Sequence, residues 1–285
     1  MGSEMCIRDS IFYRPGGEDK SIESNNGPLG FSGDNLGKGR TLPTQNLVDA
    51  FPMKDGMFAG QGSKYTLNQS NPYENRDPRL DYTILHHGSS WLNNTLDISI
   101  GGVNNPSNSA EYSKTGYYMC KFMGKFGEES QYGNKIHLWV MFRYAEMLLN
   151  YAEAVYERDD KISNTDLNIS LNLVRLRVNP AMTPLTNELI TQNAGMDMRT
   201  EIRRERTIEL FNEGFRLDDL KRWKTAETEM PMDIVGIQWK GTEYEKVWAN
   251  CPYETNAEGC IIIEKGRKWE EKNYLFPLPS DQLQL

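Results

Sequence analysis

Apolar residues recur at helical spacing over the stretch 138–156, which reads LWVMFRYAEMLLNYAEAVY. They fall three and four positions apart and form one wide stripe, which predicts an amphipathic helix packed on the core. Ala145 and Ala152 are seven residues apart on this stripe, so that another helix can approach closely there. The pattern predicts that a helical scaffold begins at Ile136.

A second helix is predicted to follow and to form a hairpin with the first. Ser163, with Asp166 three residues later, has the form of a capping box in which Asp replaces the usual Glu or Gln. Apolar residues then recur at helical spacing from Leu167 to Val178. The proline of Asn179-Pro180 ends this helix, because proline cannot continue it.

A third helix is predicted from about Asp197 to Asn212 or Glu213, with Gly214 as the residue just past its end. The stretch 215–225 predicts a fourth, shorter helix. Helix pairs that carry alanine at packing positions are typical of a tetratricopeptide-like stack. We therefore interpret 136–225 as the helical scaffold.

The region 11–135 has little helical periodicity and is dense in Gly, Pro, Asn and Ser, which favour turns and loops. Short extended pieces are predicted at 11–13, 82–85 and 117–121. The region 226–285 returns to loops, with a strand at 260–264 and an extended, proline-containing tail from Tyr274. The whole is interpreted as one mainly α domain with long loops and short β-hairpins.

Composition and charge narrow the function classes. The 285 residues include 32 Lys and Arg against 40 Asp and Glu, a net charge of −8, which argues against binding nucleic acid through overall charge. No stretch approaches the roughly 18 apolar residues that a membrane span needs. Residues 1–10 (MGSEMCIRDS) lack the apolar and basic regions of a signal peptide, and we interpret them as a non-native or misjoined leader.

Cysteine and histidine are too few to favour a structural zinc site, because the chain has four Cys, no Cys-x-x-Cys pair and three His. We expect no metal and no cofactor. Cys251 and Cys260 flank a turn, which leaves open whether they form a hairpin-closing disulfide or remain two thiols.

A row of glutamates four residues apart lies on one face of the third helix, at Glu201, Glu205, Glu209 and Glu213. Such carboxylates also occur in acid–base and dimetal sites. Here arginines alternate with them and the helices carry no histidine, which favours a ladder of salt bridges between helices. Replacing Glu209 or Arg216 by alanine is therefore expected to lower stability more than ligand affinity.

Several motifs together resemble the RagB/SusD family. The run ERTIELFNEGFRLDDLKRW at 205–223 resembles the family signature of an Arg- and Glu-rich helix, a Gly, Asp-Leu and Arg-Trp. Further matches in family order are LPTQNLVDAF (42–51), NPYENRDPRL (71–80), FRYAE (142–146), YAEA (151–154), NLVRLR (172–177) and YLFPLP (274–279). The motif residues to which we assign a structural role are Asp77, Arg79, Arg143, Glu146, Glu205, Arg206, Glu209, Glu213, Gly214, Arg216, Asp219, Arg222 and Trp223.

The resemblance implies a SusD-like tetratricopeptide-type helical scaffold and a function without catalysis. Such proteins are lipid-anchored at the extracellular face of the outer membrane, capture oligosaccharides or other nutrients, and pass them to a SusC-like TonB-dependent transporter. Members are roughly twice as long as this chain and begin with an acylated cysteine. We therefore expect this chain to be the C-terminal portion of a longer protein, and Cys6 not to be the lipid site.

Glycan binding also agrees with the loop composition, because sugar rings stack on Trp and Tyr while their hydroxyls need polar partners. Trp91 is the preferred stacking residue, since it lies in a polar loop between His86-His87 and Asn93-Asn94. The predicted ligand-binding residues are Trp91, Tyr112, Asn93, Asn94, Tyr82, Trp239 and Trp248. Trp139 and Trp223 lie on predicted helices and are expected in the core.

Two other functions stay open on the residues alone. An intracellular helical-repeat adaptor that binds a peptide is compatible with 136–225, although adaptors of that kind keep their loops short. A glycoside hydrolase would need two carboxylates roughly 5–10 Å apart across a cleft. No spacing in the loops singles out such a pair.

Overall fold

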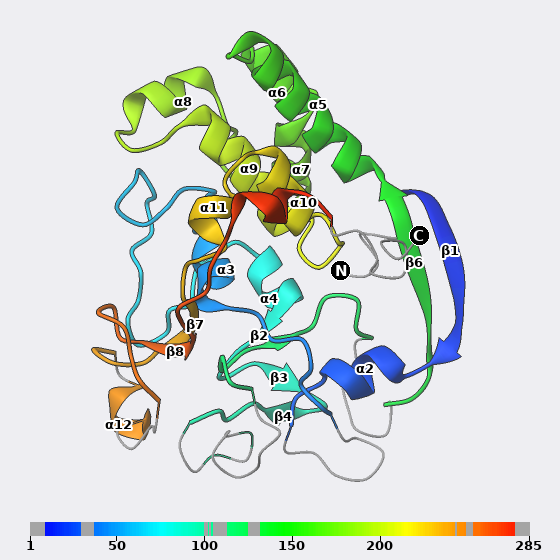
Figure 1. Ribbon diagram of the computed structural model, residues 1–285, viewed down its shortest axis with the longest axis vertical. Coiled ribbons are helices and arrows are strands. Elements are labelled where there is room, and N and C mark those ends of the chain that lie inside the picture. The colour runs from blue at the N-terminus through cyan, green and yellow to red at the C-terminus, as the bar shows by residue number, and fades with distance from the viewer. Residues whose placement is uncertain are drawn as a thin grey trace.

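The computed structural model of the chain describes residues 9–29, 37–99, 102, 104, 113–124, 132–242, 244–248 and 253–276. The helices are α2 (Ser21–Asn26), α3 (Gln45–Ala50), α4 (Arg79–Thr83), α5 (Tyr144–Asp159), α6 (Asn164–Asn168), α7 (Leu171–Val178), α8 (Asn187–Gln192), α9 (Met198–Glu209), α10 (Arg216–Arg222), α11 (Ala226–Glu229) and α12 (Glu245–Trp248), followed by a 3-10 turn at Glu271–Tyr274. The strands are β1 (Ser10–Asp19), β2 (Ile84–Leu85), β3 (Ser90–Trp91), β4 (Asn94–Thr95), β5 (Tyr118–Met119), β6 (Lys135–Arg143), β7 (Ile234–Gln238) and β8 (Cys260–Glu264) (Figure 1). They pair antiparallel as β1–β6, β2–β5, β3–β4 and β7–β8. No described helix is long and apolar enough to cross a membrane.

The helical scaffold is built on α5, which packs on α7 and α9. Ala145 and Ala152 of α5 are buried in this core beside Leu149, as their spacing predicted. Because an alanine side chain is a single methyl group, it lets the neighbouring helix lie close. The predicted helical hairpin is confirmed, with α5 as its first arm and α6 and α7 as its second.

The predicted ends of the second helix are also confirmed. The Ser163 hydroxyl accepts a hydrogen bond from the backbone N–H of Asp166 at 3.0 Å and caps α6. Helix α7 ends at Val178, just before Asn179-Pro180. Both signals act within a few residues of chain, so they can be recognised without knowledge of the rest of the fold.

Helix α9 begins where it was predicted and ends earlier. The Asp197 carboxylate accepts a hydrogen bond from the backbone N–H of Thr200 at 2.9 Å and caps the helix. The helix ends at Glu209 instead of Asn212 or Glu213. Asn212 and Gly214 have φ values of +60° and +89°, a left-handed conformation that interrupts the helix and turns the chain toward α10.

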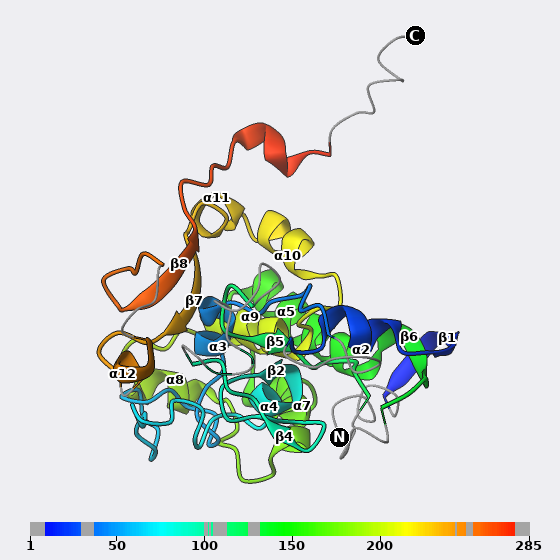
Figure 2. The same ribbon diagram turned by 90° about the horizontal axis from the view of Figure 1, so that it is seen from below.

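The first predicted helix is partly wrong, because residues 138–143 form part of strand β6. This strand pairs with β1, and Phe12 lies opposite Phe142 while Arg14 lies opposite Trp139. The two strands run side by side at one edge of the molecule (Figures 1 and 2). A short apolar run that is rich in aromatic and β-branched residues suits a strand as well as a helix, so periodicity alone cannot separate the two.

The fold also includes two residues that we assigned to the leader. Ser10 opens β1, and the Asp9 carboxylate lies 3.3 Å from the Arg143 guanidinium and 3.1 Å from that of Arg177. Asp9 and Ser10 are thus held by this strand and these ion pairs, and the interpretation of residues 1–10 as a leader stays a prediction.

Trp139 is 71% exposed on β6, which corrects its expected place in a helical core. We expect Trp139→Ala to change the free energy of unfolding by no more than about 0.5 kcal/mol, the usual range for surface positions. A tryptophan in a core would cost about 3–5 kcal/mol on the same change. Urea unfolding followed by circular dichroism separates these outcomes, and a loss in the larger range would contradict the exposed position.

The loop-rich region has a hydrophobic core of its own. Its buried residues include Trp91, Leu96, Tyr117 and Ile237, which come from the loops and from β7. The predicted extended pieces at 11–13 and 260–264 lie in β1 and β8, whereas Tyr82 falls in α4. The short helices α2, α3 and α4 escaped prediction, because helices of five or six residues carry little periodicity.

Candidate functional site

Trp91 closes the small hairpin formed by β3 and β4. Its turn residues Leu92 and Asn93 have φ values of +50° and +58°, the two left-handed positions of a type I′ turn, whose twist suits two-residue hairpins. The Trp91 ring is only 7% exposed and lies edge-on to Tyr132, with ring centroids 6.4 Å apart. The ring therefore packs inside the loop core, and a ligand-facing role for Trp91 stays a prediction.

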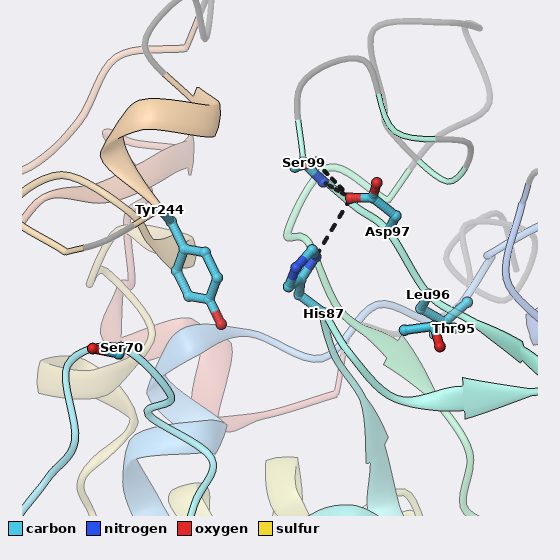
Figure 3. A pocket seen from close by; sticks show the side chains of 7 residues that line it. All are labelled: Ser70, His87, Thr95, Leu96, Asp97, Ser99 and Tyr244. Carbon is cyan, nitrogen blue, oxygen red and sulfur yellow. Dashed lines mark hydrogen bonds and ion pairs between the residues drawn. The ribbon is translucent and has the colours of Figure 1, made fainter.

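A pocket of about 560 Å³ lies next to this hairpin. Its lining residues are Ser70, His87, Thr95, Leu96, Asp97, Ser99 and Tyr244. Figure 3 shows the Tyr244 ring on one side and His87 and Asp97 on the other. The pocket brings together three separate segments of the chain: Ser70, the stretch 87–99, and Tyr244, which directly precedes α12.

Polar atoms and one aromatic ring face this pocket. One oxygen of Asp97, Oδ1, accepts hydrogen bonds from the Ser99 backbone N–H at 3.1 Å and from the Ser99 hydroxyl at 2.5 Å. The His87 Nδ1 atom lies 3.7 Å from the same oxygen. The His87 ring meets Tyr244 edge-on, with centroids 5.4 Å apart.

His87 is neutral at neutral pH. Partial burial lowers the pKa of His87 below its ordinary value, because it disfavours the charged imidazolium, and the nearby Asp97 carboxylate only partly opposes this. The Nδ1 atom is buried and makes no hydrogen bond with the residues that the structure describes. A neutral imidazole, a carboxylate and the hydroxyl groups of Ser70, Thr95, Ser99 and Tyr244 suit the recognition of hydroxyl groups.

Backbone contacts hold the pocket residues in place. The Gly88 N–H donates to the Leu96 carbonyl at 2.9 Å, and the Leu96 N–H donates to the Ser89 carbonyl at 2.8 Å. The Asp97 N–H donates to the Asn104 side-chain oxygen at 3.0 Å, and the Asn104 N–H donates back to the Asp97 carbonyl at 3.0 Å. This pairing fixes the loop that carries Asp97 before any ligand arrives.

The predicted ligand residues that the structure describes do not line this pocket. Asn93 and Asn94 are exposed near the hairpin turn, Tyr82 is half-buried in α4, and Trp239 is 8% exposed in the loop core. Trp248 belongs to α12, but its side chain and all of Tyr112 lie outside the described residues. The sequence offered a weak signal for Tyr244, which lies between Trp239 and Trp248 in a polar loop.

Glu209 is the centre of a buried network of charged side chains. Its Oε1 atom lies 2.7 Å from Arg143 and 2.7 Å from Arg177, and its Oε2 atom lies 3.1 Å from Arg79. Burial alone would raise the pKa of Glu209, but these guanidinium groups lower it well below its ordinary value. Glu209 is therefore ionised and fully paired, which suits a structural role and not acid–base chemistry.

The other charged motif residues extend this network between elements. The further pairs are Arg79 with Asp77 and Glu205, Arg143 with Glu213, Lys121 with Glu213, Arg175 with Glu205, Arg206 with Asp219, and Arg222 with Glu153 and Asp219. Glu146 is also buried, and its pKa is raised because burial disfavours the charged carboxylate. The ladder predicted from spacing thus has partners on α4, on β6, on a loop and on the neighbouring helices α7 and α10, and Arg222 of α10 links it to Glu153 of α5.

Two members of this motif lie nearer the surface than expected. The Arg216 side chain is 47% exposed, donates to the Thr207 hydroxyl at 2.9 Å and pairs with Glu229. Trp223, which was expected in the core, is half-buried at the end of α10, and its indole N–H donates to Glu153. Both follow α9 on the short outer helix α10, where one side faces solvent.

The part of the chain that the structure describes holds no group of three His, Cys, Asp or Glu side chains arranged as metal ligands. Cys260 is buried and forms no disulfide with a described residue, and Cys251 lies outside the described residues. The pairing of these two cysteines therefore stays open.

Comparison with known proteins gives one consistent family. A model described as the SusD family matches residues 9–285. A SusD-like carbohydrate binding protein from Bacteroides fragilis NCTC 9343 is 25% identical with a TM-score of 0.77, over 97% of this chain and 53% of its own. A second SusD-like protein from the same organism is 26% identical with a TM-score of 0.71, over 97% of this chain and 52% of its own. This chain thus spans about half the length of these proteins. No curated protein matches it.

Proposed function

Because the chain belongs to the SusD family, we propose that it binds carbohydrate without catalysis, through the pocket between Tyr244, His87 and Asp97. The observation that carries this proposal is the composition of the pocket. A tyrosine ring offers a face for the C–H side of a sugar, while Asp97, Ser99 and His87 offer hydrogen bonds to its hydroxyls. A solved relative described as a carbohydrate binding protein supports the same class of ligand.

The proposal extends to the place and partner of the whole protein. We propose that it acts at the extracellular face of the outer membrane, held there by a lipid anchor. There it delivers the captured glycan to a SusC-like TonB-dependent transporter. Membership of the SusD family supports this role, and the fully paired carboxylates of the α9 network speak against an acid–base site in the scaffold.

Tyr244→Ala tests the proposed site. We expect this variant to bind its glycan roughly 5- to 30-fold more weakly, the effect of losing about 1–2 kcal/mol of aromatic contact. The measurement is affinity electrophoresis against a panel of polysaccharides, followed by calorimetry with those that retard the protein.

Tyr144→Ala is the matched control, because Tyr144 is 52% exposed on α5 and does not line the pocket. It should bind as the unchanged protein does, and circular dichroism should show both variants folded. If Tyr244→Ala and the unchanged protein have the same glycan affinity, this pocket is not the glycan-binding site.

A further inference from the structure

The charge of the pocket sets a limit on the sugars that it can hold. Of its seven lining residues, Asp97 carries a negative charge and none is a lysine or an arginine. Asp97 is not neutralised by His87, because the imidazole is uncharged at neutral pH. An anionic group brought into this pocket would meet a carboxylate without a cationic partner, whereas proteins bind carboxylates and sulfates mostly through Arg and Lys.

None of the described residues that line the pocket supplies this missing cation. From Ser99, which lines the pocket, to Ser113 the sequence contains no lysine or arginine. Lys246, two residues beyond Tyr244, is exposed on α12 and is not a lining residue. The described lining residues therefore bring one carboxylate and no cationic side chain to the pocket.

The same carboxylate is well placed to accept a hydroxyl. Its Oδ1 atom is occupied by Ser99, which orients the group, while Oδ2 makes no hydrogen bond with the described residues (Figure 3). The Asp97 side chain is 48% exposed, so that a ligand can reach this second oxygen. Hydrogen bonds to an ionised acceptor are roughly twice as strong as neutral ones, so a sugar hydroxyl is a favourable donor here.

On the premise of the proposed function, we infer that this pocket selects uncharged glycans and rejects sulfated and uronic-acid-containing ones. Tyr244 supplies the stacking face, and Asp97 both accepts a hydroxyl and repels an anionic substituent. Selectivity of this kind combines an attractive contact to one ligand with a repulsive contact to its competitor.

Matched pairs of polysaccharides test this selectivity. The probes are dextran with dextran sulfate, hydroxyethyl cellulose with carboxymethyl cellulose, and unsubstituted xylan with glucuronoxylan, in low-salt affinity gels. We expect retardation by at least one neutral member and none by its anionic counterpart, with the retardation lost in Tyr244→Ala. Binding of an anionic member at least as tight as the neutral one, and sensitive to Tyr244→Ala, would overturn the inference while leaving the proposed function intact.

Asp97→Asn separates charge from shape, since it keeps the size of the side chain and removes its charge. We expect the preference for the neutral over the anionic member to narrow by about tenfold at low salt, and less at high salt where charges are screened. An unchanged preference would show that Asp97 is not its source and would overturn the inference. If no polysaccharide in the panel binds, the proposed function fails and the inference falls with it.

Discussion

Replacing Glu209 by glutamine is expected to lower the free energy of unfolding by about 3–5 kcal/mol, the usual cost of breaking a buried ion pair from one side. Glu209 is 6% exposed and contacts three guanidinium groups, those of Arg79, Arg143 and Arg177. Glutamine keeps the size of the side chain but removes its charge. The Arg143 side chain, which is 2% exposed, then loses one of its carboxylate partners in a region that water does not reach.

The pH dependence of stability gives this prediction a second readout. Because the folded protein lowers the pKa of Glu209 well below 4.5, its ordinary value, the ionised group stabilises the fold above that value. This contribution is lost as pH falls toward the folded pKa, since protonation then uncouples the network. The difference in stability between the unchanged protein and Glu209→Gln should therefore shrink as urea unfolding is repeated from pH 7 downward.

Arg216→Ala is the control from the same motif. Its side chain is 47% exposed, and exposed ion pairs contribute about 0–1 kcal/mol. We therefore expect only a small loss of stability for Arg216→Ala, although the sequence predicted a structural role for both Glu209 and Arg216. Similar losses in both variants would contradict the buried network as the source of the difference.

The sequence predicted the helical scaffold because its signals are local. Ser163 and Asp197 cap helices through contacts within three residues, and the alternating charges of α9 lie on one helix turn after another. The SusD-like, helix-rich fold is confirmed. The ladder was recognised from spacing, but its main partners Arg79 and Arg143 lie on other segments, and only their family motifs pointed to them.

The sequence analysis fails where the local structure depends on residues that are far away in the sequence. Residues 138–143 form a strand because β1, more than a hundred residues earlier, provides its hydrogen bonds. The pocket brings Ser70, Asp97 and Tyr244 together from separate loops, which no spacing along the chain can show. A polar surrounding sequence likewise does not reveal how far an aromatic ring is buried, and Trp91 is buried although its neighbours in the sequence are polar.

Trp91→Ala is expected to cost about 3–5 kcal/mol of unfolding free energy, as for other large aromatic residues removed from a core. If the ring instead stacks on the glycan, as the sequence predicts, the same change would lower the glycan affinity by about 1–2 kcal/mol. We expect the loss of stability because Trp91 is 7% exposed, packs near Tyr132 and approaches Gly27.

Trp139→Ala makes the same chemical change at a ring that is 71% exposed, so comparing the two variants isolates the effect of burial. Trp91→Phe should retain most of the packing, with a smaller loss of stability and nearly unchanged binding. Trp91 lies on strand β3 of the hairpin, and the pocket residues Thr95 and Leu96 lie at the end of its partner strand β4 and just after it. Removal of Trp91 should therefore weaken binding only as far as it unfolds this core. Full stability of Trp91→Ala together with lost glycan binding would place the ring at the ligand after all, and would shift the site from Tyr244 to the hairpin.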